Sequence, residues 1–296
     1  MNQKISPLVT YCIPVYNHEK YVENTIDSII LQDYENIELI IINDGSTDNS
    51  HSVIIKKIEK CRERFKKFTY INRENKGLSY SLNEALNIAE GTYISLIASD
   101  DIILSNKTSI QTEFLEKNQN FYACAGTQIT IDSDGNVLPV KYQKYIISKH
   151  LEIDKRILFR MTNMIYSPTC MYRLNILKNL GGYDESIAIE DLYLFYLAAS
   201  KGHNIALLPI IFTLYRHHTN NNHKNYIMMH ENKLKILDIF KYDNSYSSLK
   251  RLVLLEGFYS LAKKNKLKAI KTLPYVIKYI DSIYLYGGIF NLLFKW

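Results

Sequence analysis

The chain has 296 residues, of which 47% are hydrophobic and 22% charged, and this composition excludes a disordered, fibrous or low-complexity protein. Its net charge of +6 arises in the last quarter, since Glu231 to Trp296 carry 12 Lys and Arg against 5 Asp and Glu, whereas the first 230 residues carry 24 against 25. A basic interaction surface is therefore expected only in the C-terminal quarter.

The first hundred residues alternate short apolar runs with helical patterns. Continuous β-branched runs are typical of strands buried on both faces, and their alternation with helices predicts an α/β fold with a parallel sheet. Strands are predicted at Leu8–Ile13, Ile37–Asn43, Phe68–Asn72 and Thr92–Ala98, and helices at Glu19–Leu31, Ser50–Phe65 and Ser79–Ala89.

The pattern changes after residue 101. The sequence predicts a helix at Thr108–Asn118, a meander at Tyr122–Val140, a helix at His150–Arg160 and another at the end of Gly181–Gly202. Past His223 the chain is helical, without a strong strand signal. No Pro-, Ser- or Gly-rich linker interrupts it, so we expect one domain over residues 1–225 and a helical C-terminal extension over residues 226–296.

The cysteines and the N-terminus indicate a cytoplasmic protein. Four scattered cysteines without a CxxC pair are expected to be buried free thiols in a reducing compartment. The apolar N-terminal stretch is short and broken by Pro14, so no signal peptide is expected. The sequence has no uncharged apolar run of 18 residues, so a membrane-spanning helix is not expected.

Polar clusters follow three of the predicted strands. "IPVYN" ends the first, "INDGSTDNS" follows the second and "ASDD" ends the fourth, and parallel strands bring such ends to one edge of a sheet. Taken alone, each of the first two clusters is explained better by a strand end, a turn or a helix cap than by a ligand site. In the third, Asp100 and Asp101 repel one another, and oxygen ligands at a strand end suit Mg²⁺ or Mn²⁺ bound to phosphates.

Two further clusters lie downstream. Glu190 and Asp191 precede an amphipathic helix, where they are either ordinary acids of a helix N-terminus or a general base near a substrate hydroxyl. The segment Leu214–His223 is predicted to be one polar loop, which either contacts a diphosphate or is simply exposed. It contains no HxxxH or Cys partner that would make it a zinc site.

Together these motifs resemble the inverting glycosyltransferases of family 2, which have the GT-A fold. The resemblance implies a Rossmann-like, mostly parallel central sheet flanked by helices, with a nucleotide-binding half at residues 1–101 and an acceptor and catalytic half at 102–225. It covers roughly Val9 to Asn222 and leaves the last 70 or so residues uncovered. The matching motifs are "PVYN" (Pro14–Asn17), "NDGSTD" (Asn43–Asp48), "NKGLSYSLNEAL" (Asn75–Leu86), "GTYISLIASDD" (Gly91–Asp101), "GGYDE" with "EDLYL" (Gly181–Leu194) and "YRHH" (Tyr215–His218).

The resemblance assigns a role to each matching position. In the nucleotide site, Tyr16 and Asp44 would hold the base and ribose, with Pro14, Asn17, Lys76, Gly77, Asn83 and Ser99 around them. In the metal site, Asp100 would bind a divalent cation, Mn²⁺ or Mg²⁺, with Asp101 supporting it and His218 near the metal or diphosphate. In catalysis, Asp191 would be the base that deprotonates the acceptor, and Glu190 would position substrate.

One position departs from the family pattern. The acidic motif of the family commonly reads Asp-x-Asp, and Ala98 occupies its first place. We expect this loss to weaken metal or nucleotide affinity by ~1–3 kcal/mol, as for a lost charged hydrogen bond, without abolishing the chemistry.

The implied activity is metal-dependent, inverting transfer of a sugar from a nucleotide-diphosphate sugar, UDP-linked by preference. The acceptor would be a glycan or polyprenyl-linked saccharide of a bacterial surface polysaccharide such as capsule or O-antigen. The alternatives are a catalytically inactive nucleotide-sugar-binding protein and a sugar-phosphate nucleotidylyltransferase, although no glycine-rich phosphate loop lies near the N-terminus. Neither GxGxxG nor GxxxxGK[ST] is present, which excludes a dinucleotide-binding oxidoreductase and a P-loop nucleotidase.

The tail interleaves lysines with apolar residues over Leu261–Ile280 and adds aromatics over Ile283–Trp296. Such helices either lie on an anionic membrane or form a helical cap with a solvated lysine face. Lipid-linked acceptors in the family favour peripheral attachment to the inner face of the cytoplasmic membrane. A nucleic-acid partner is not expected, because no recognised nucleic-acid motif accompanies the charge.

Overall fold

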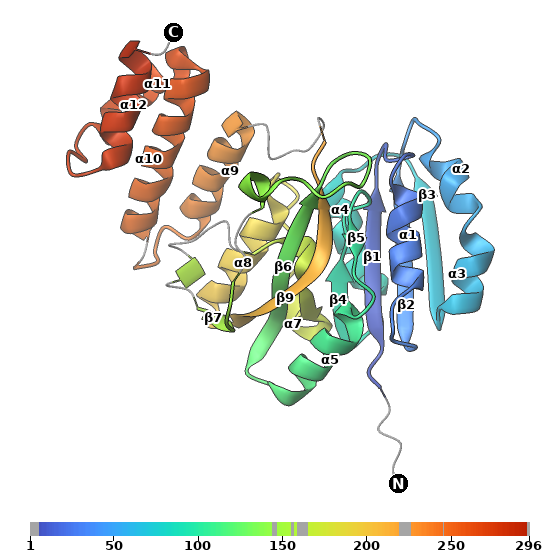
Figure 1. The fold of residues 1–296 in the computed structure, drawn as a ribbon. Helices are drawn as coiled ribbons and strands as arrows, with labels where there is room; N and C mark the ends of the chain where they lie inside the picture. The colour runs from blue at the N-terminus through green and yellow to red at the C-terminus, as the bar shows by residue number, and fades with distance from the viewer. Residues whose placement is uncertain are drawn as a thin grey trace. The chain divides into compact units, whose positions relative to one another are not determined.

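The computed structural model describes residues 6–143, 147–154, 157–158, 165–218, 226–244 and 246–294. The chain divides into two compact units (Figure 1). The sheet unit comprises Met1–Glu185 and Glu190–Thr219, and the helical unit comprises Ser186–Ile189 and Asn220–Trp296. The boundary predicted at residue 225 lies outside the described residues.

The sheet unit is built on a nine-stranded sheet in the order β3–β2–β1–β4–β8–β6–β9–β5, with β7 paired to β9. This mixed architecture, with helices around a curled central sheet, confirms the predicted α/β class. The strands in sheet order are β3 (Lys67–Arg73), β2 (Ile37–Asp44), β1 (Val9–Val15), β4 (Tyr93–Leu96), β8 (Met171–Arg173), β6 (Phe121–Ile131), β9 (Asn204–Arg216) and β5 (Ile102–Ile103), with β7 at Leu151–Ile153.

Strand direction determines which chain ends meet. The four strands β3, β2, β1 and β4 are parallel, as predicted. Strand β8 is antiparallel to both β4 and β6, so β6 runs in the same direction as β4, and β9 is parallel to β6. The carboxyl ends of β1, β2, β4, β6 and β9 therefore lie at one edge of the sheet.

Strand β1 continues past Pro14, which was expected to end its ladder. Pro14 pairs with Ile42, and Val15 pairs with Asn43. The Cys12 carbonyl accepts from the Ile97 amide on the β4 side, and Pro14, two residues later, faces the same side beyond the last β4 pair. The missing proline N–H thus removes no ladder hydrogen bond.

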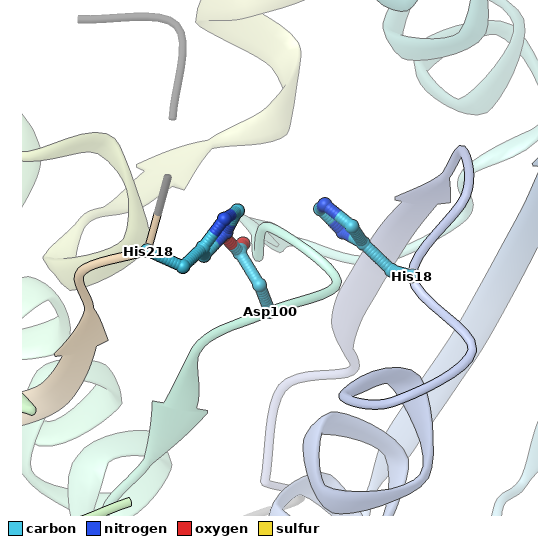
Figure 2. A group of neighbouring side chains, drawn as sticks. All are labelled: His18, Asp100 and His218. Atoms are coloured by element: carbon cyan, nitrogen blue, oxygen red, sulfur yellow. The ribbon is translucent and has the colours of Figure 1, made fainter. Parts of the chain in front are cut away.

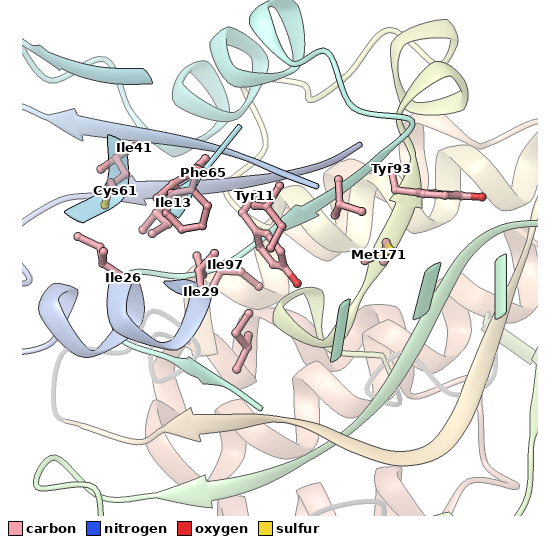
Figure 3. Close-up of a cluster of buried hydrophobic side chains, with 14 of the residues drawn as sticks. Tyr11, Ile13, Ile26, Ile29, Ile41, Cys61, Phe65, Tyr93, Ile97 and Met171 are labelled. Carbon is pink, nitrogen blue, oxygen red and sulfur yellow. The ribbon is translucent and has the colours of Figure 1, made fainter. Parts of the chain in front are cut away.

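The helices of the sheet unit cover its core. Ile13 of β1, Ile41 of β2 and Ile26 and Ile29 of α1 are fully buried in one cluster (Figure 3). All four cysteines are free and buried, as predicted. The helices are α1 (Val22–Ile30), α2 (Ser50–Ile55), α3 (Ile58–Arg64), α4 (Leu78–Ile88), α5 (Lys107–Lys117), α7 (Leu174–Asn179) and α8 (Glu190–Ser200), with 3-10 turns at Val140–Tyr142 and Ser167–Thr169.

Several predictions for the second half were wrong. The expected meander at Tyr122–Val140 is one long strand, β6, followed by a turn with a single bridge between Ile131 and Val137. The range His150–Arg160, expected to be a helix, begins with strand β7 instead. Part of that range lies outside the described residues. Leu214–Arg216, expected in a loop, form the end of β9. These strands pair across long sequence separations, so no local pattern specified their partners.

The helical unit has a core of its own. Leu255, Phe258 and Leu261 of α10 pack with Leu285 of α12. The predicted helical character of the chain past His223 is confirmed wherever that region is described, and none of the described helices has the length and apolarity that crossing a bilayer requires. Its helices are α9 (Tyr226–Ile239), α10 (Tyr246–Lys264), α11 (Lys266–Val276) and α12 (Ile283–Phe294).

Candidate active site

The candidate site lies at the carboxyl edge of the sheet. His18 follows β1, Asp44 ends β2, Ser99 and Asp100 follow β4, and His218 follows β9. In open α/β sheets this edge is where ligands bind. The fold thus brings together polar residues that are up to 200 positions apart in the sequence.

Asp44 organises the turn that contains Lys76 and Gly77. Its carboxylate accepts from the backbone N–H groups of Lys76 and Gly77, each at 2.8 Å, and forms an ion pair with Arg73. The close approach of the two segments requires a glycine after Asp44, because a Cβ on Gly45 would lie 2.5 Å from the Asn75 nitrogen and the backbone there has φ +71°. Asp44, Lys76 and Gly77, predicted to share a nucleotide site, therefore meet.

The loop after β1 is tied to the loop after β2. Asn17 has a left-handed backbone with φ 54°, and its side-chain oxygen accepts from the Thr47 amide at 2.8 Å. The sequence suggested Asn17 as a cap of the helix that follows. Its side chain instead bonds the loop after β2. Tyr16, beside it, is half exposed and offers a ring face to solvent. Pro14, two residues earlier, remains part of β1.

Three side chains form a candidate metal centre. The Nε2 atom of His218 lies 2.8 Å from Oδ2 of Asp100, and one ligand atom each from His18, Asp100 and His218 all lie within 4.8 Å of one another. Figure 2 shows His18 facing the other two side chains from the opposite side of the group. Nitrogen and carboxylate donors at this spacing fit a divalent cation.

Asp101 faces away from this group. One of its carboxylate oxygens accepts from the Arg216 backbone N–H at 2.9 Å, and its own carbonyl accepts from Thr25. Burial, together with the charge of Asp100, raises the pKa of Asp101 well above its ordinary value. Asp101 joins the ends of β4 and β9 and is not in the described group of ligand atoms, so the supporting role predicted for it stays a prediction.

Glu190 and Asp191 begin α8, side by side. Each keeps some exposed surface but is largely enclosed by protein, and this burial raises the pKa of both carboxyl groups. The pKa of Glu190 rises to about 8, with the charge of Asp191 acting in the same direction. The Leu192 amide donates to Asp191 at 2.6 Å. At neutral pH the pair therefore holds a proton that ordinary carboxylates would have lost.

The pKa of Tyr215 is affected by charges both at the candidate metal centre and at the start of α8. Burial raises the pKa of its phenol, and the charges of Asp101, Asp100 and Asp191 raise it further. A single side chain near the end of β9 thus lies within electrostatic range of both the predicted metal ligand and the predicted base. This arrangement agrees with one site shared by Asp100 and Asp191.

Asn83 and Ser99 have partners within the protein. The Asn83 amide exchanges hydrogen bonds with the backbone of Tyr183, at 2.8 and 2.9 Å, so its side chain joins α4 to the segment before α8. The Ser99 hydroxyl lies 2.7 Å from Nδ1 of His18. Contact of either side chain with a nucleotide remains a prediction.

His18 was not among the predicted site residues, and Arg216, predicted in a polar loop that contacts a diphosphate or is exposed, is instead buried at the end of β9. His18 follows the matched "PVYN" motif directly, but a histidine there carries no local signal. Arg216 is 2% exposed, and its guanidinium donates to the carbonyls of Asp100, Asp132 and Ser133. A buried arginine is visible only once the strand ends have been brought together.

Comparisons with known proteins agree with this geometry. The family model "Glycosyl transferase family 2" matches residues 10–181. An uncharacterized glycosyltransferase of Rickettsia typhi is 30% identical over 202 residues, which cover 66% of this chain and 60% of the relative. One from Haemophilus influenzae is 31% identical over 220 residues, covering 72% and 67%. The chain thus spans only part of the length of these relatives.

Solved structures share the fold at low sequence identity. S. aureus TarS 1–349 in complex with UDP-GlcNAc has a TM-score of 0.68 at 20% identity, over 96% of this chain and 89% of the other. The mannosyltransferase PcManGT of Pyrobaculum calidifontis, in complex with GDP-Man and Mn²⁺, has a TM-score of 0.64 at 16% identity, over 99% and 89%.

Proposed function

This chain belongs to glycosyl transferase family 2 and has the GT-A fold, and from that premise we propose that it transfers a sugar, with inversion, from a UDP-sugar to a hydroxyl group of a glycan or lipid-linked saccharide. The observation that carries the proposal is that one side chain at the end of β9, Tyr215, is affected by charges from both parts of the site. A possible cation site at Asp100 and the acid Asp191 at the start of α8 both act on the phenol of Tyr215.

We assign donor binding to the loops after β1 and β2. The half-exposed ring of Tyr16 suits stacking on a nucleobase, and Asp44 fixes the Lys76–Gly77 turn that would line the same pocket. A uridine donor is supported by the UDP-GlcNAc complex of TarS, whereas PcManGT binds GDP-Man. The nucleotide preference therefore has to be tested with both UDP- and GDP-sugars.

The residues at the metal centre fit a divalent cation. Asp100 and His218 are nearly buried, and their side chains already point at one another, so a cation would replace the hydrogen bond between them. When bound, such a cation would neutralise charge that develops on the leaving diphosphate. The role of these two residues is to hold it beside the donor.

The acids of α8 supply the proton chemistry. The acceptor oxygen attacks the anomeric carbon as the bond from that carbon to the diphosphate breaks, and the hydroxyl proton passes to Asp191. Burial keeps a proton on the pair at neutral pH, and Glu190 is assigned to carry it and to donate a hydrogen bond to substrate. Of the pair, Asp191 therefore serves as the base.

The acceptor proposal rests on the surface of the helical unit. Along α12, Ile283, Tyr286, Phe290 and Phe294 are spaced three or four residues apart and form one exposed face, with exposures of 81, 60, 53 and 69%. The opposite face is buried, with Gly288 close against Phe258 of α10. A soluble monomer rarely exposes such a continuous apolar face.

Charge around this apolar face matches an anionic membrane. From Leu261 to Trp296 the chain carries seven lysines and a single acid, Asp281, which is bonded to Arg251. Lys271, beside exposed Ile270 in α11, is exposed, and so is Lys278 just beyond that helix. Apolar side chains with a surrounding excess of lysine are typical of helices that lie at an anionic bilayer surface. We assign a lipid-linked acceptor, as in surface-polysaccharide synthesis, on this basis.

Donor turnover tests the catalytic proposal. The protein is incubated with Mn²⁺ and a panel of UDP- and GDP-sugars, and both nucleotide release and the thermal shift are measured. We expect at least one UDP-sugar to raise the melting temperature and to be slowly hydrolysed, with Asp100→Asn losing hydrolysis. Stabilisation without release would indicate an inactive nucleotide-sugar-binding protein, and neither effect with any donor would overturn the proposal.

Flotation with lipid vesicles tests the membrane proposal. The protein should float with vesicles containing phosphatidylglycerol and not with pure phosphatidylcholine. The double variant Ile283→Glu, Phe290→Glu should lose flotation, whereas Leu31→Glu, at an apolar residue 69% exposed in the sheet unit, should not. Unchanged flotation of the double variant would contradict the proposal. It would also be contradicted if the only effect of the double substitution were to convert a dimer to a monomer.

A further inference from the structure

His18 stands out among the residues at the site because the proposed mechanism does not use it. It lies 200 positions before His218 in the sequence, yet a ligand atom of each and of Asp100 fall within a common 4.8 Å. In Figure 2 the His18 side chain extends from the segment after β1 toward Asp100 and His218, which come from the ends of β4 and β9. Three separate strand ends thus converge on one point.

The His18 ring is held in an orientation that suits a metal ligand. Nδ1 lies 2.7 Å from the Ser99 hydroxyl, and the His18 backbone N–H donates to the Ser50 hydroxyl at 3.0 Å. In the tautomer in which Nδ1 donates to Ser99, Nε2 retains its lone pair for a metal. Metal-binding histidines commonly use the other ring nitrogen in this way, because the second hydrogen bond fixes both the tautomer and the ring plane.

Aromatic packing fixes the two imidazoles relative to one another. Tyr21 stacks on His218 with ring centroids 5.3 Å apart and meets His18 edge-on at 5.9 Å. The two histidine rings are themselves perpendicular, with centroids 5.8 Å apart. Tyr21 therefore acts as a spacer that keeps both rings beside Asp100.

We propose that His18 is a third protein ligand of the cation at Asp100 and His218, and that it makes the site select Mn²⁺ over Mg²⁺. The inference rests on the proposed function, since it concerns the same cation. Two imidazole nitrogens with one carboxylate favour a transition metal, whereas Mg²⁺ prefers an all-oxygen shell that includes several waters. The donor set itself would therefore determine the metal preference.

Mn²⁺ binding to the full chain tests this assignment without measuring turnover. Free Mn²⁺ is titrated by electron paramagnetic resonance with and without UDP, and pulsed spectra count the nitrogens coupled to the bound ion. We expect two coupled nitrogens in the wild type. His18→Asn should leave one, weaken Mn²⁺ binding by at least about 10-fold and lower the preference for Mn²⁺ over Mg²⁺ in competition.

Two controls guard against loss of folding. His51→Asn removes an exposed histidine that is bonded to Tyr70 and is not among the three grouped ligands, and it should change neither affinity nor the spectra. Ser99→Ala retains His18 but removes its orienting hydrogen bond, and should weaken Mn²⁺ binding less than His18→Asn does. Thermal melting shows whether each variant is folded. If His18→Asn is unfolded, His18→Gln is used in its place.

The outcomes separate this inference from the proposed function. If Asp100→Asn abolishes binding but neither His18 variant changes affinity or nitrogen coupling, His18 is not a ligand and the inference is overturned, while the cation at Asp100 stands. If Asp100→Asn also leaves binding unchanged, or the wild type binds no Mn²⁺, both the inference and the proposed metal site fail.

Discussion

Two places in the sheet unit hold their carboxylates in opposite ways. In residues 6–101, Asp44 is surrounded by donors, two backbone N–H groups and the Arg73 guanidinium, and its charge holds a turn in place. In residues 102–218, Glu190 and Asp191 lie side by side, and burial raises the pKa of each. A carboxylate with donors maintains geometry, whereas a buried pair of acids retains a proton. The proposed roles follow this contrast, with donor binding assigned near Asp44 and proton transfer assigned to Asp191.

The sharpest test of this contrast is Asp191→Asn. Removing the base should lower kcat by ~10²–10⁴-fold and leave UDP-sugar affinity unchanged, because Asp191 is assigned to the acceptor and not to the donor. Transfer rates and calorimetric donor affinity measure the two effects separately. Asp134→Asn, at an exposed acid in the turn after β6, serves as the control. Undiminished turnover in Asp191→Asn would remove this residue from the mechanism.

Asp44→Asn should have the reverse profile. Loss of the buried ion pair with Arg73 should lower the free energy of unfolding by about 2–3 kcal/mol and weaken UDP binding by about 10-fold, with little change in kcat at saturating donor. Urea unfolding and calorimetry measure these effects. Glu59→Gln, which removes an exposed pair with Arg62, should cost less than about 1 kcal/mol. A variant that lost kcat instead would contradict the division of roles.

Lys107 gives the second half a pH-dependent stability. This fully buried side chain donates to Ser95 at 2.6 Å and to the Cys170 carbonyl at 3.2 Å, and burial lowers its pKa to about 7. Between pH 7 and its ordinary value of 10.5, the unfolded chain binds the proton that the folded chain has lost, so this group makes stability rise with pH.

The measurement is the difference in unfolding free energy between the wild type and Lys107→Met from pH 7 to 8.5, in which the titration of groups common to both proteins, the cysteines included, cancels. The wild type should gain up to about 1.4 kcal/mol per pH unit relative to the variant. Lys117→Met, at an exposed lysine paired with Glu113, should show no such difference. Parallel pH curves for wild type and Lys107→Met would show that Lys107 keeps an ordinary proton affinity.

Ala98→Asp should have the smallest effect. Restoring the first acid of the family motif should strengthen Mn²⁺ and UDP binding by about 1 kcal/mol, the lower end for a charged hydrogen bond, because a third carboxylate also repels Asp100 and Asp101. Calorimetry with both ligands measures it, with Ala98→Asn as the uncharged control. Weaker binding in Ala98→Asp would show that the site is complete without this acid.

Local sequence patterns predicted the first half far better than the second. Strands β1 to β4 were predicted to within two residues at each end, because short β-branched runs alternate there with clear helices. The predicted helix at Ser50–Phe65 is instead two helices that break at Lys56 and Lys57. Strand β9 was missed although Ile205–Tyr215 is strongly apolar, since its partner β6 lies some 80 residues earlier.

Contacts within the candidate site could be predicted only for residues that belong to the matched motifs. Asp100 and His218 were assigned to one centre and are bonded there, and Asp44 was assigned to the same pocket as Lys76 and Gly77. His18 could not be found in this way, because only the closure of three strand ends places it beside the other two ligands.

The arrangement around Arg216 has a thermodynamic consequence for metal binding. This single buried side chain bonds the carbonyls after β4 and β6, its own backbone N–H is held by Asp101, and its guanidinium lies 4.9 Å from the centroid of Tyr21. The segments that carry Asp100 and His218 are thereby ordered when the chain folds. An arriving cation would meet donors already in register, so its affinity would be reduced little by lost conformational entropy.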